Sequence, residues 1–152
     1  MSHPTSTRSV EILLVEDNPG DIRLTQEALK EGGFAYQLRI ARDGVEAMTI
    51  LHREGENANA PLPDLILLDL NLPRKDGREV LAEIKSDDEL KRIPVVILTT
   101  SEAAKDVQKV YALHANCYII KPVNLDNFIE TIKSIESFWL NTVKLPARNA
   151  GE

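Results

Sequence analysis

Charged side chains stand at the ends of three short apolar segments of this chain. Glu16 and Asp17 follow residues 12–15, Asp69 follows residues 65–68, and Lys121 follows residues 118–120. Short apolar runs of this kind are typical of strands buried on both faces of a parallel sheet. Ligands of such sheets bind at the carboxyl ends of the strands, so we expect a functional site at that edge.

The acidic residues of this set indicate a metal site. Carboxylates that converge in a small pocket repel one another unless a cation neutralises them, and Mg²⁺ prefers oxygen ligands. We expect Asp17 and Asp69 to bind Mg²⁺ directly. The backbone carbonyl of Asn71 would supply a third oxygen, and Glu16 would act through a bound water. The alternative is that Glu16 and Asp17 only cap the helix that follows them.

Lys121 and Thr99 add groups that can stabilise negative charge. An ammonium and a hydroxyl beside carboxylates and a metal ion suit a phosphoryl oxygen. The chemistry predicted from this set is phosphoryl transfer to a carboxylate oxygen, with Asp69 as the acceptor. Two structural alternatives remain: an ion pair between Lys121 and Asp69, and a Thr99 that only caps its helix.

Composition restricts the class of protein. The 152 residues are 43% hydrophobic and 28% charged, which fits one globular domain with an ordinary core. The single cysteine, Cys117, excludes an internal disulfide and is consistent with a reducing cytoplasm. A net charge of −6 with scattered basic residues argues against a nucleic-acid partner. The sequence shows neither a signal peptide nor a membrane-spanning stretch, so we expect a cytoplasmic protein.

Apolar runs alternate with helical patterns, which predicts repeated βα units and a parallel sheet. The predicted strands are Val10–Val15, Gln37–Ala41, Asp64–Leu68, Pro94–Leu98 and Cys117–Ile120. The predicted helices are Asp21–Glu31 with Asn18 as its cap, one capped by Asp43, one around residues 80–84, one around residues 107–113, and Leu125 to about Leu140. For the helix after Asp43, the core side is expected to include Val45, Met48, Ile50 and Leu51. Five βα units leave no room for an effector domain after about Val143, and Gly55–Pro63 is expected to be a surface loop.

These motifs, taken together, resemble the receiver domain of two-component response regulators, the fold of the single-domain chemotaxis regulators. The matching stretches are residues 14–18 (LVEDN), 67–73 (LLDLNLP), 76–77 (DG), 97–101 (ILTTS) and 118–122 (YIIKP). They occur in the order of the family and cover the chain from about Val10 to Leu140. The expected organisation is a flexible N-terminus at 1–9, a receiver domain at 10–143 with an extended last helix, and a tail at 144–152.

The resemblance implies a flavodoxin-like, doubly wound (βα)5 fold, with strand order 2-1-3-4-5 and helices on both faces. It implies that Asp69 accepts a phosphoryl group from a sensor histidine kinase, and that Thr99, Lys121 and Tyr118 contact the phosphoryl group or respond to it. Tyr118 can also be read as ordinary half-buried core. The protein would be a switch rather than an enzyme. Two departures from the family pattern are Glu16, where Asp is more frequent, and Thr100, where a smaller residue is usual.

A narrower resemblance concerns the helix surface at residues 76–85 and the C-terminal stretch at residues 135–146. The sequences of both stretches resemble those of the small regulators that partner cyanobacterial and other bacterial phytochromes. This resemblance implies a light-regulated histidine kinase as phosphodonor. The cluster of Ile135, Phe138, Trp139 and Leu140 is broader than one apolar stripe and predicts a homodimer interface. The alternative is that this extension folds back over its own domain.

Three other functions are alternatives to this switch. A receiver-like adaptor that acts without phosphorylation stays open. A phosphohydrolase of the aspartyl-phosphate type places a second Asp two residues after the nucleophile, and here that residue is Asn71, which cannot act as a general acid or base. A nucleotide-binding domain would need a glycine-rich phosphate loop after Val15, and the sequence has none there.

Overall fold

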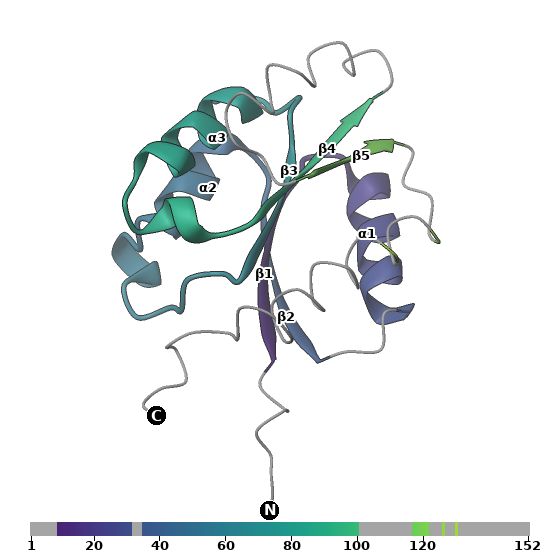
Figure 1. Ribbon diagram of the computed structural model, residues 1–152, viewed down its shortest axis with the longest axis horizontal. Coiled ribbons are helices and arrows are strands. Elements are labelled where there is room, and N and C mark those ends of the chain that lie inside the picture. Colours follow the sequence, from purple (N-terminus) through teal and green to yellow (C-terminus); the bar gives the residue numbers. More distant parts are fainter. Residues whose placement is uncertain (1–8, 32–34, 101–116, 122–125, 127–129, 131–152) are drawn as a thin grey trace, which may run out of the picture.

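The computed structural model describes residues 9–31, 35–100, 117–121, 126 and 130. Five parallel strands form one sheet in the order β2-β1-β3-β4-β5 (Figure 1). The strands are β1 (Val10–Val15), β2 (Tyr36–Ala41), β3 (Leu65–Asp69), β4 (Val95–Thr100) and β5 (Cys117–Lys121). The helices are α1 (Pro19–Glu31), α2 (Gly44–Leu51) and α3 (Gly77–Ser86), with short 3-10 turns η2 (Gly55–Asn57) and η3 (Leu90–Arg92).

The central strands β1 and β3 are largely apolar, as expected for strands that are covered on both faces. Every residue of β3 is buried, and β1 is buried at all positions except the intermediate Glu11. Successive side chains point to opposite faces, so β1, β3 and β4 each contribute to two separate clusters. The cluster on the α2 and α3 side contains Leu13, Val15, Ile66, Leu68 and Ile97, and the cluster on the α1 side contains Ile12, Leu14, Leu65, Leu67 and Leu98.

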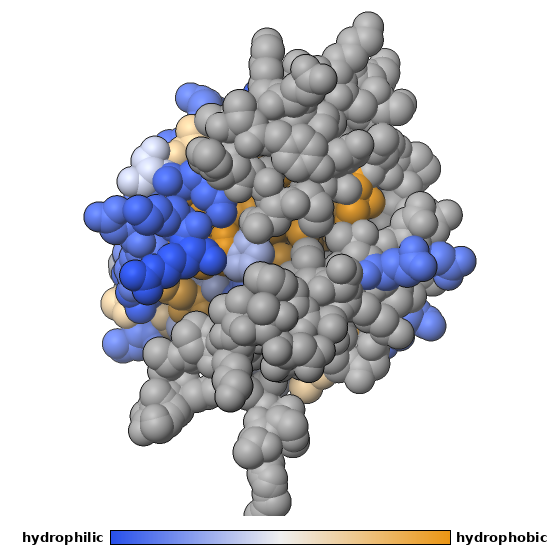
Figure 2. Space-filling model, viewed as in Figure 1, coloured by the Kyte–Doolittle hydropathy of each residue, from blue (hydrophilic) through white to orange (hydrophobic). Residues whose placement is uncertain are grey.

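Helix α1 lies on one face of the sheet, and α2 and α3 lie together on the other (Figure 1). Figure 2 shows hydrophilic side chains over the flank formed by α2 and α3, with apolar residues deeper in the molecule. The helices begin where polar side chains cap them. Asn18 Oδ1 accepts from Asp21 N at 3.0 Å, and Asp43 Oδ1 accepts from Glu46 N at 2.8 Å.

The structure confirms the predicted fold class, strand order and placement of helices on both faces. It corrects one core residue: Val45 is 40% exposed. The buried side of α2 is formed by Gly44, Ala47, Met48, Ile50 and Leu51. Gly44 faces the neighbouring loop. Val45 is the next residue of the helix, and because successive helical residues point in different directions, its side chain turns away from that loop.

The predicted helices around residues 107–113 and 125–140, and the proposed boundaries at residues 9 and 143, fall on segments outside the described residues in whole or in large part. These boundaries stay predictions. In the part of the chain that the structure describes, no helix combines the length and apolar character needed to cross a membrane.

Candidate functional site

The ends of β1 and β3 bring three carboxylates together. Val15 is paired with Leu68 in the sheet, so Glu16 and Asp69 are the next residues along two adjacent parallel strands. Carboxylate oxygens of Glu16, Asp17 and Asp69 all lie within 4.8 Å of one another. Glu16 is fully buried and Asp69 is 2% exposed, whereas Asp17 is exposed. The site therefore has a buried floor and an acidic side chain open to solvent.

Backbone amides orient the two buried carboxylates. Asn18 N–H donates to Glu16 Oε2 at 3.2 Å, and Asn71 N–H donates to Asp69 Oδ1 at 3.1 Å. In both cases the donor lies two residues after the acid, at the turn that leaves the strand. A hydrogen bond of this local kind fixes the direction of a short acidic side chain.

The donor set fits a divalent cation. Three acidic side chains so close together repel one another in the absence of a positive charge, and two of them are shielded from water. Hard cations such as Mg²⁺ take carboxylate oxygens as ligands. Glu16, Asp17 and Asp69 are thus the described residues that could hold the ion, and the structure brings together the acids singled out in the sequence.

The loop after Asp69 is fixed by a glycine that begins α3. A Cβ at Gly77 would lie 2.3 Å from the backbone oxygen of Asp69 and 2.6 Å from Cα of Leu70, so no larger residue fits without a backbone shift. Gly77 N–H donates to the carbonyl of Leu70 at 3.1 Å. The start of α3 is therefore in direct contact with the peptide unit of Asp69.

A capping box holds the same helix start. The Asp76 carboxylate accepts from Arg78 N–H at 2.7 Å, and the Glu79 carboxylate accepts from Asp76 N–H at 3.2 Å. These two bonds satisfy amides that have no partner within the helix. They place Gly77, and through it Asp69, at a defined position.

A second glycine connects this loop to α2. A Cβ at Gly44 would lie 2.2 Å from the backbone oxygen of Lys75. Arg74, which has a φ of 67°, places its guanidinium 3.4 Å from Asp43 Oδ2. Residues other than glycine seldom adopt this left-handed conformation. Its backbone strain persists where the surrounding structure fixes the turn.

Lys75 anchors the loop to the surface of α3. Its ammonium donates to Glu83 Oε1, and His52 Nε2 lies 3.2 Å from Glu83 Oε2. The hydrogen bond from Lys75, followed by that from His52, holds the pKa of Glu83 below its ordinary value. The same bond raises the pKa of Lys75. The site loop is thereby linked to both helices on this face of the sheet.

The backbone places Thr99 and Lys121 at this edge of the sheet, whereas Tyr118 comes three residues before Lys121 in β5. Asp69 pairs with Leu98 of β4, so Thr99 comes one residue beyond the level of the acid. Lys121 is the last residue of β5 and pairs with Thr100, and Tyr118 pairs with Ile97. The side chains of these three residues are outside what the structure describes, so their contacts stay predictions. The predicted interface residues Ile135, Phe138, Trp139 and Leu140 lie outside the described residues altogether.

Sequence reasoning identified the acids but not the residues that immobilise them. Gly44, Arg74 and the packing role of Gly77 were missed. A glycine directly after the helix cap Asp43, and another directly after Asp76, were the available signals. The sequence around these two glycines does not show which distant backbone segment packs against each of them.

Comparison with known families gives a match to the response regulator receiver domain over residues 12–133. Response regulator Rcp1 from Synechocystis sp. (strain ATCC 27184 / PCC 6803 / Kazusa) is 58% identical over 136 residues, which cover 90% of this chain and 92% of Rcp1.

Solved structures give the same result. The phosphorylated cyanobacterial phytochrome response regulator RcpA is 58% identical, with a TM-score of 0.78 over 92% of this chain and 100% of RcpA. The Mn²⁺-bound form of Rcp1 is 57% identical, with a TM-score of 0.76 over 91% of this chain and 99% of that one.

Proposed function

Because this chain belongs to the response regulator receiver domain family, whose members are phosphorylated on an aspartate by a histidine kinase, we propose that Asp69 is the phosphoacceptor. The observation that carries this assignment is the position of Asp69. It ends a central strand, is almost fully buried, and has two further carboxylates within 4.8 Å. A buried acid held at a strand end in an acidic cluster is suited to receive a phosphoryl group beside a divalent cation.

The proposed reaction is the transfer of a phosphoryl group from a phosphohistidine of the kinase. An oxygen of Asp69 attacks phosphorus, the phosphorus–nitrogen bond breaks, and the imidazole leaves with its electron pair, so that an acyl phosphate forms on Asp69. Glu16 and Asp17 would hold Mg²⁺ together with Asp69 and the backbone carbonyl of Asn71. When bound, Mg²⁺ supplies positive charge that offsets the carboxylates and the phosphoryl oxygens.

The family resemblance assigns the remaining roles. Lys121 and Thr99 contact the transferred phosphoryl group, and Tyr118 responds to the movement of Thr99. The positions of Thr99 and Lys121 at the carboxyl ends of β4 and β5 support their part of this assignment, and the role of Tyr118 rests on the resemblance alone. The domain carries out transfer and later hydrolysis on itself and turns over no external substrate.

The partner kinase proposed for this chain is a phytochrome. Support comes from RcpA, which is described as a cyanobacterial phytochrome response regulator. A homodimer formed through Ile135, Phe138, Trp139 and Leu140 is part of the same proposal and rests on the sequence alone. A cytoplasmic location is supported by the single cysteine, which is consistent with a reducing compartment.

Intact mass measured after incubation with acetyl phosphate tests the proposed function. We expect a gain of one phosphoryl group that needs Mg²⁺ and is absent in Asp69→Asn. Asp76→Asn is the matched control, because it removes a carboxylate from the same loop but keeps an oxygen that can cap α3. Failure of the wild-type protein to gain mass from acetyl phosphate and from a phytochrome kinase would favour the adaptor function instead.

A further inference from the structure

Among the strands that the structure describes, β2 is at one edge of the sheet, with β1 as its neighbour. The carbonyls of Ala35 and Ala41 accept from Val10 and Glu16, which shows that odd-numbered residues turn their backbone groups toward β1. Backbone direction alternates along a parallel strand, so Leu38 and Ile40 turn their N–H and C=O groups toward the outer edge. An edge of this kind is a template for pairing with another extended segment.

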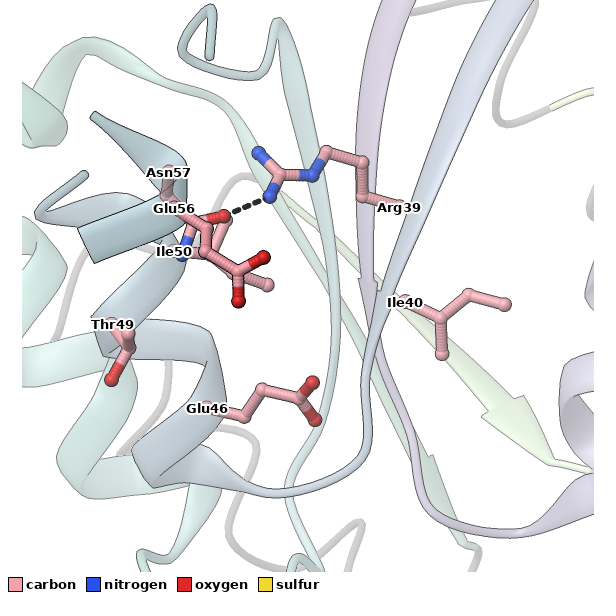
Figure 3. A pocket seen from close by; sticks show the side chains of 7 residues that line it. All are labelled: Arg39, Ile40, Glu46, Thr49, Ile50, Glu56 and Asn57. Atoms are coloured by element: carbon pink, nitrogen blue, oxygen red, sulfur yellow. Dashed lines mark hydrogen bonds between the residues drawn. The ribbon is translucent and has the colours of Figure 1, made fainter. Parts of the chain in front are cut away.

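A pocket of about 470 Å³ adjoins β2. It lies between β2, α2 and η2, and its charged lining residues are Arg39, Glu46 and Glu56 (Figure 3). The carboxylates of Glu46 and Glu56 point into the space between the helical segments and the strand. Both residues are exposed, so the pocket is open to a partner in solution.

The charge of this pocket selects the kind of partner. The guanidinium of Arg39 donates to the amide oxygen of Asn57, a group that carries no charge. Glu46 Oε1 accepts from Arg42 N–H at 2.8 Å, which orients the carboxylate without neutralising it. Two carboxylates and one guanidinium give the pocket an excess of negative charge. A lysine or arginine side chain is the complementary group.

We propose that β2 and the adjoining pocket dock an extended, Lys- or Arg-bearing segment of a partner protein. The segment adds a strand to the sheet by pairing with Leu38 and Ile40, and one basic side chain enters the pocket between Glu46 and Glu56. Strand addition of this kind obtains affinity from main-chain hydrogen bonds and specificity from side-chain pockets.

A second copy of this chain is a poorer occupant. The chain has a net charge of −6, and edge-to-edge pairing would bring two acidic pockets close together. The docking surface lies on β2, whereas Asp69 ends β3, and no acid of the Glu16, Asp17 and Asp69 cluster lines the pocket. The proposed contact therefore uses no residue of the acidic cluster.

The probe for this proposal is a short synthetic peptide of alternating valine and lysine, added to the full chain with backbone amides followed by NMR. We expect the amide signals of Leu38 and Ile40 to shift and to become protected from hydrogen exchange. The same peptide with glutamate in place of lysine, and the lysine peptide with alternate backbone nitrogens methylated, should leave both signals unchanged. These two peptides separate the contributions of charge and of main-chain pairing.

The variant Glu46→Gln/Glu56→Gln should weaken binding of the lysine peptide about fivefold, as expected for the loss of two exposed ion pairs. Gln at position 46 can still accept from Arg42 N–H, so α2 keeps its cap. The matched control is Glu27→Gln/Glu31→Gln on α1, which removes the same charge from an exposed helix on the other face and should change binding less than twofold.

Three results would overturn the proposal: shifts centred on β5 rather than β2, equal binding of the lysine and glutamate peptides, or equal weakening by the two double variants. Protection of Leu38 and Ile40 without peptide, together with self-association, would show that a second copy occupies the edge.

Discussion

The chain leaves β1 and β3 in very different ways, although both strands end in acids of the same site. After β1 it passes through Glu16 and Asp17 directly into α1, and residues 17–20 are all exposed. After β3 it follows a longer path through residues 70–76, which two glycines, a capping box and two ion pairs hold against α2 and α3. The site is therefore exposed to solvent where the chain leaves β1, and it is held by packing, hydrogen bonds and ion pairs where the chain leaves β3.

This difference matches what the two acids are proposed to do. Asp69 must meet a phosphorus atom in a defined direction, and its loop allows little movement. Asp17 must exchange a solvated cation, and it is exposed. Changes after β3 should therefore disturb the fold and the acceptor, whereas changes after β1 should affect metal binding with little effect on the fold.

The largest effect is expected for Gly77→Ala. The added methyl group would meet the backbone of Asp69 and Leu70 at 2.3 and 2.6 Å, and neither backbone can move without shifting β3 or its loop. We expect a loss of about 3 kcal/mol in the free energy of unfolding and a slower phosphorylation of Asp69. Urea denaturation and the rate of acetyl phosphate labelling measure the two effects.

Gly20→Ala is the matched control for that variant. A Cβ at Gly20 meets only the side-chain oxygen of Asn18, at 3.2 Å, and Gly20 lies in the first turn of α1. The free energy of unfolding should change by less than about 1 kcal/mol. Equal destabilisation by the two variants would show that the loop after β3 is no more tightly held than the start of α1.

The second effect is expected for Asp17→Asn, which alters the open end of the site. With free Mg²⁺ about 100-fold above its Kd, the wild-type protein should gain about 2.7 kcal/mol of stability from the bound ion. Asp17→Asn should lose most of this gain, and its metal-free stability should equal or exceed that of the wild type because one of the repelling carboxylates is neutralised. Thermal unfolding with and without Mg²⁺ measures both quantities. Asp88→Asn, a change at an exposed acid outside the cluster, should keep the full Mg²⁺ effect.

A smaller effect is expected for Asp76→Ala, which removes the cap of α3. The amide of Arg78 loses its acceptor, and the free energy of unfolding should fall by about 1 kcal/mol. Asp76→Ser should restore most of this stability, because a hydroxyl oxygen can cap the same amide. If serine fails to rescue the alanine variant, Asp76 acts through its charge rather than through the cap.

The smallest effect concerns Glu83, which anchors Lys75. Its pKa is lowered in the folded protein, so the stability it contributes is present above the pKa of the unfolded chain and is lost as the pH falls through the folded value. Its side chain is 36% exposed, so the difference between wild type and Glu83→Gln should stay below about 0.5 kcal/mol at neutral pH. Denaturation curves should show this difference shrinking below about pH 4. A difference that grows as the pH falls below about 4 would contradict the assignment.

The strand ends were predictable from sequence because each apolar run ends abruptly in a charged residue, and parallel strands bring such ends to one edge. The same pattern predicts that Glu16, Asp17 and Asp69 lie together, as they do in the structure. It also placed the cap of α2 at Asp43, because a cap depends on residues adjacent in the sequence.

Features that depend on distant segments were not predictable in this way. Val45 fits a helical apolar pattern, but a helix as short as α2 leaves its orientation to the loop that packs against Gly44. The left-handed conformation of Arg74 is another case, since nothing in its side chain favours a φ of 67°. The pocket beside β2 arises from η2, within a segment that the sequence marked only as a surface loop.

The most direct test of the central claim is to locate the phosphoryl group. Phosphorylated protein is reduced with borohydride, which converts an aspartyl phosphate to homoserine, and is then digested and sequenced by mass spectrometry. We predict homoserine at position 69, dependent on Mg²⁺ during phosphorylation. Reduction at Asp17 instead, or a phosphoryl group on a histidine, would contradict the assignment of Asp69 as acceptor and of its neighbours as the metal site.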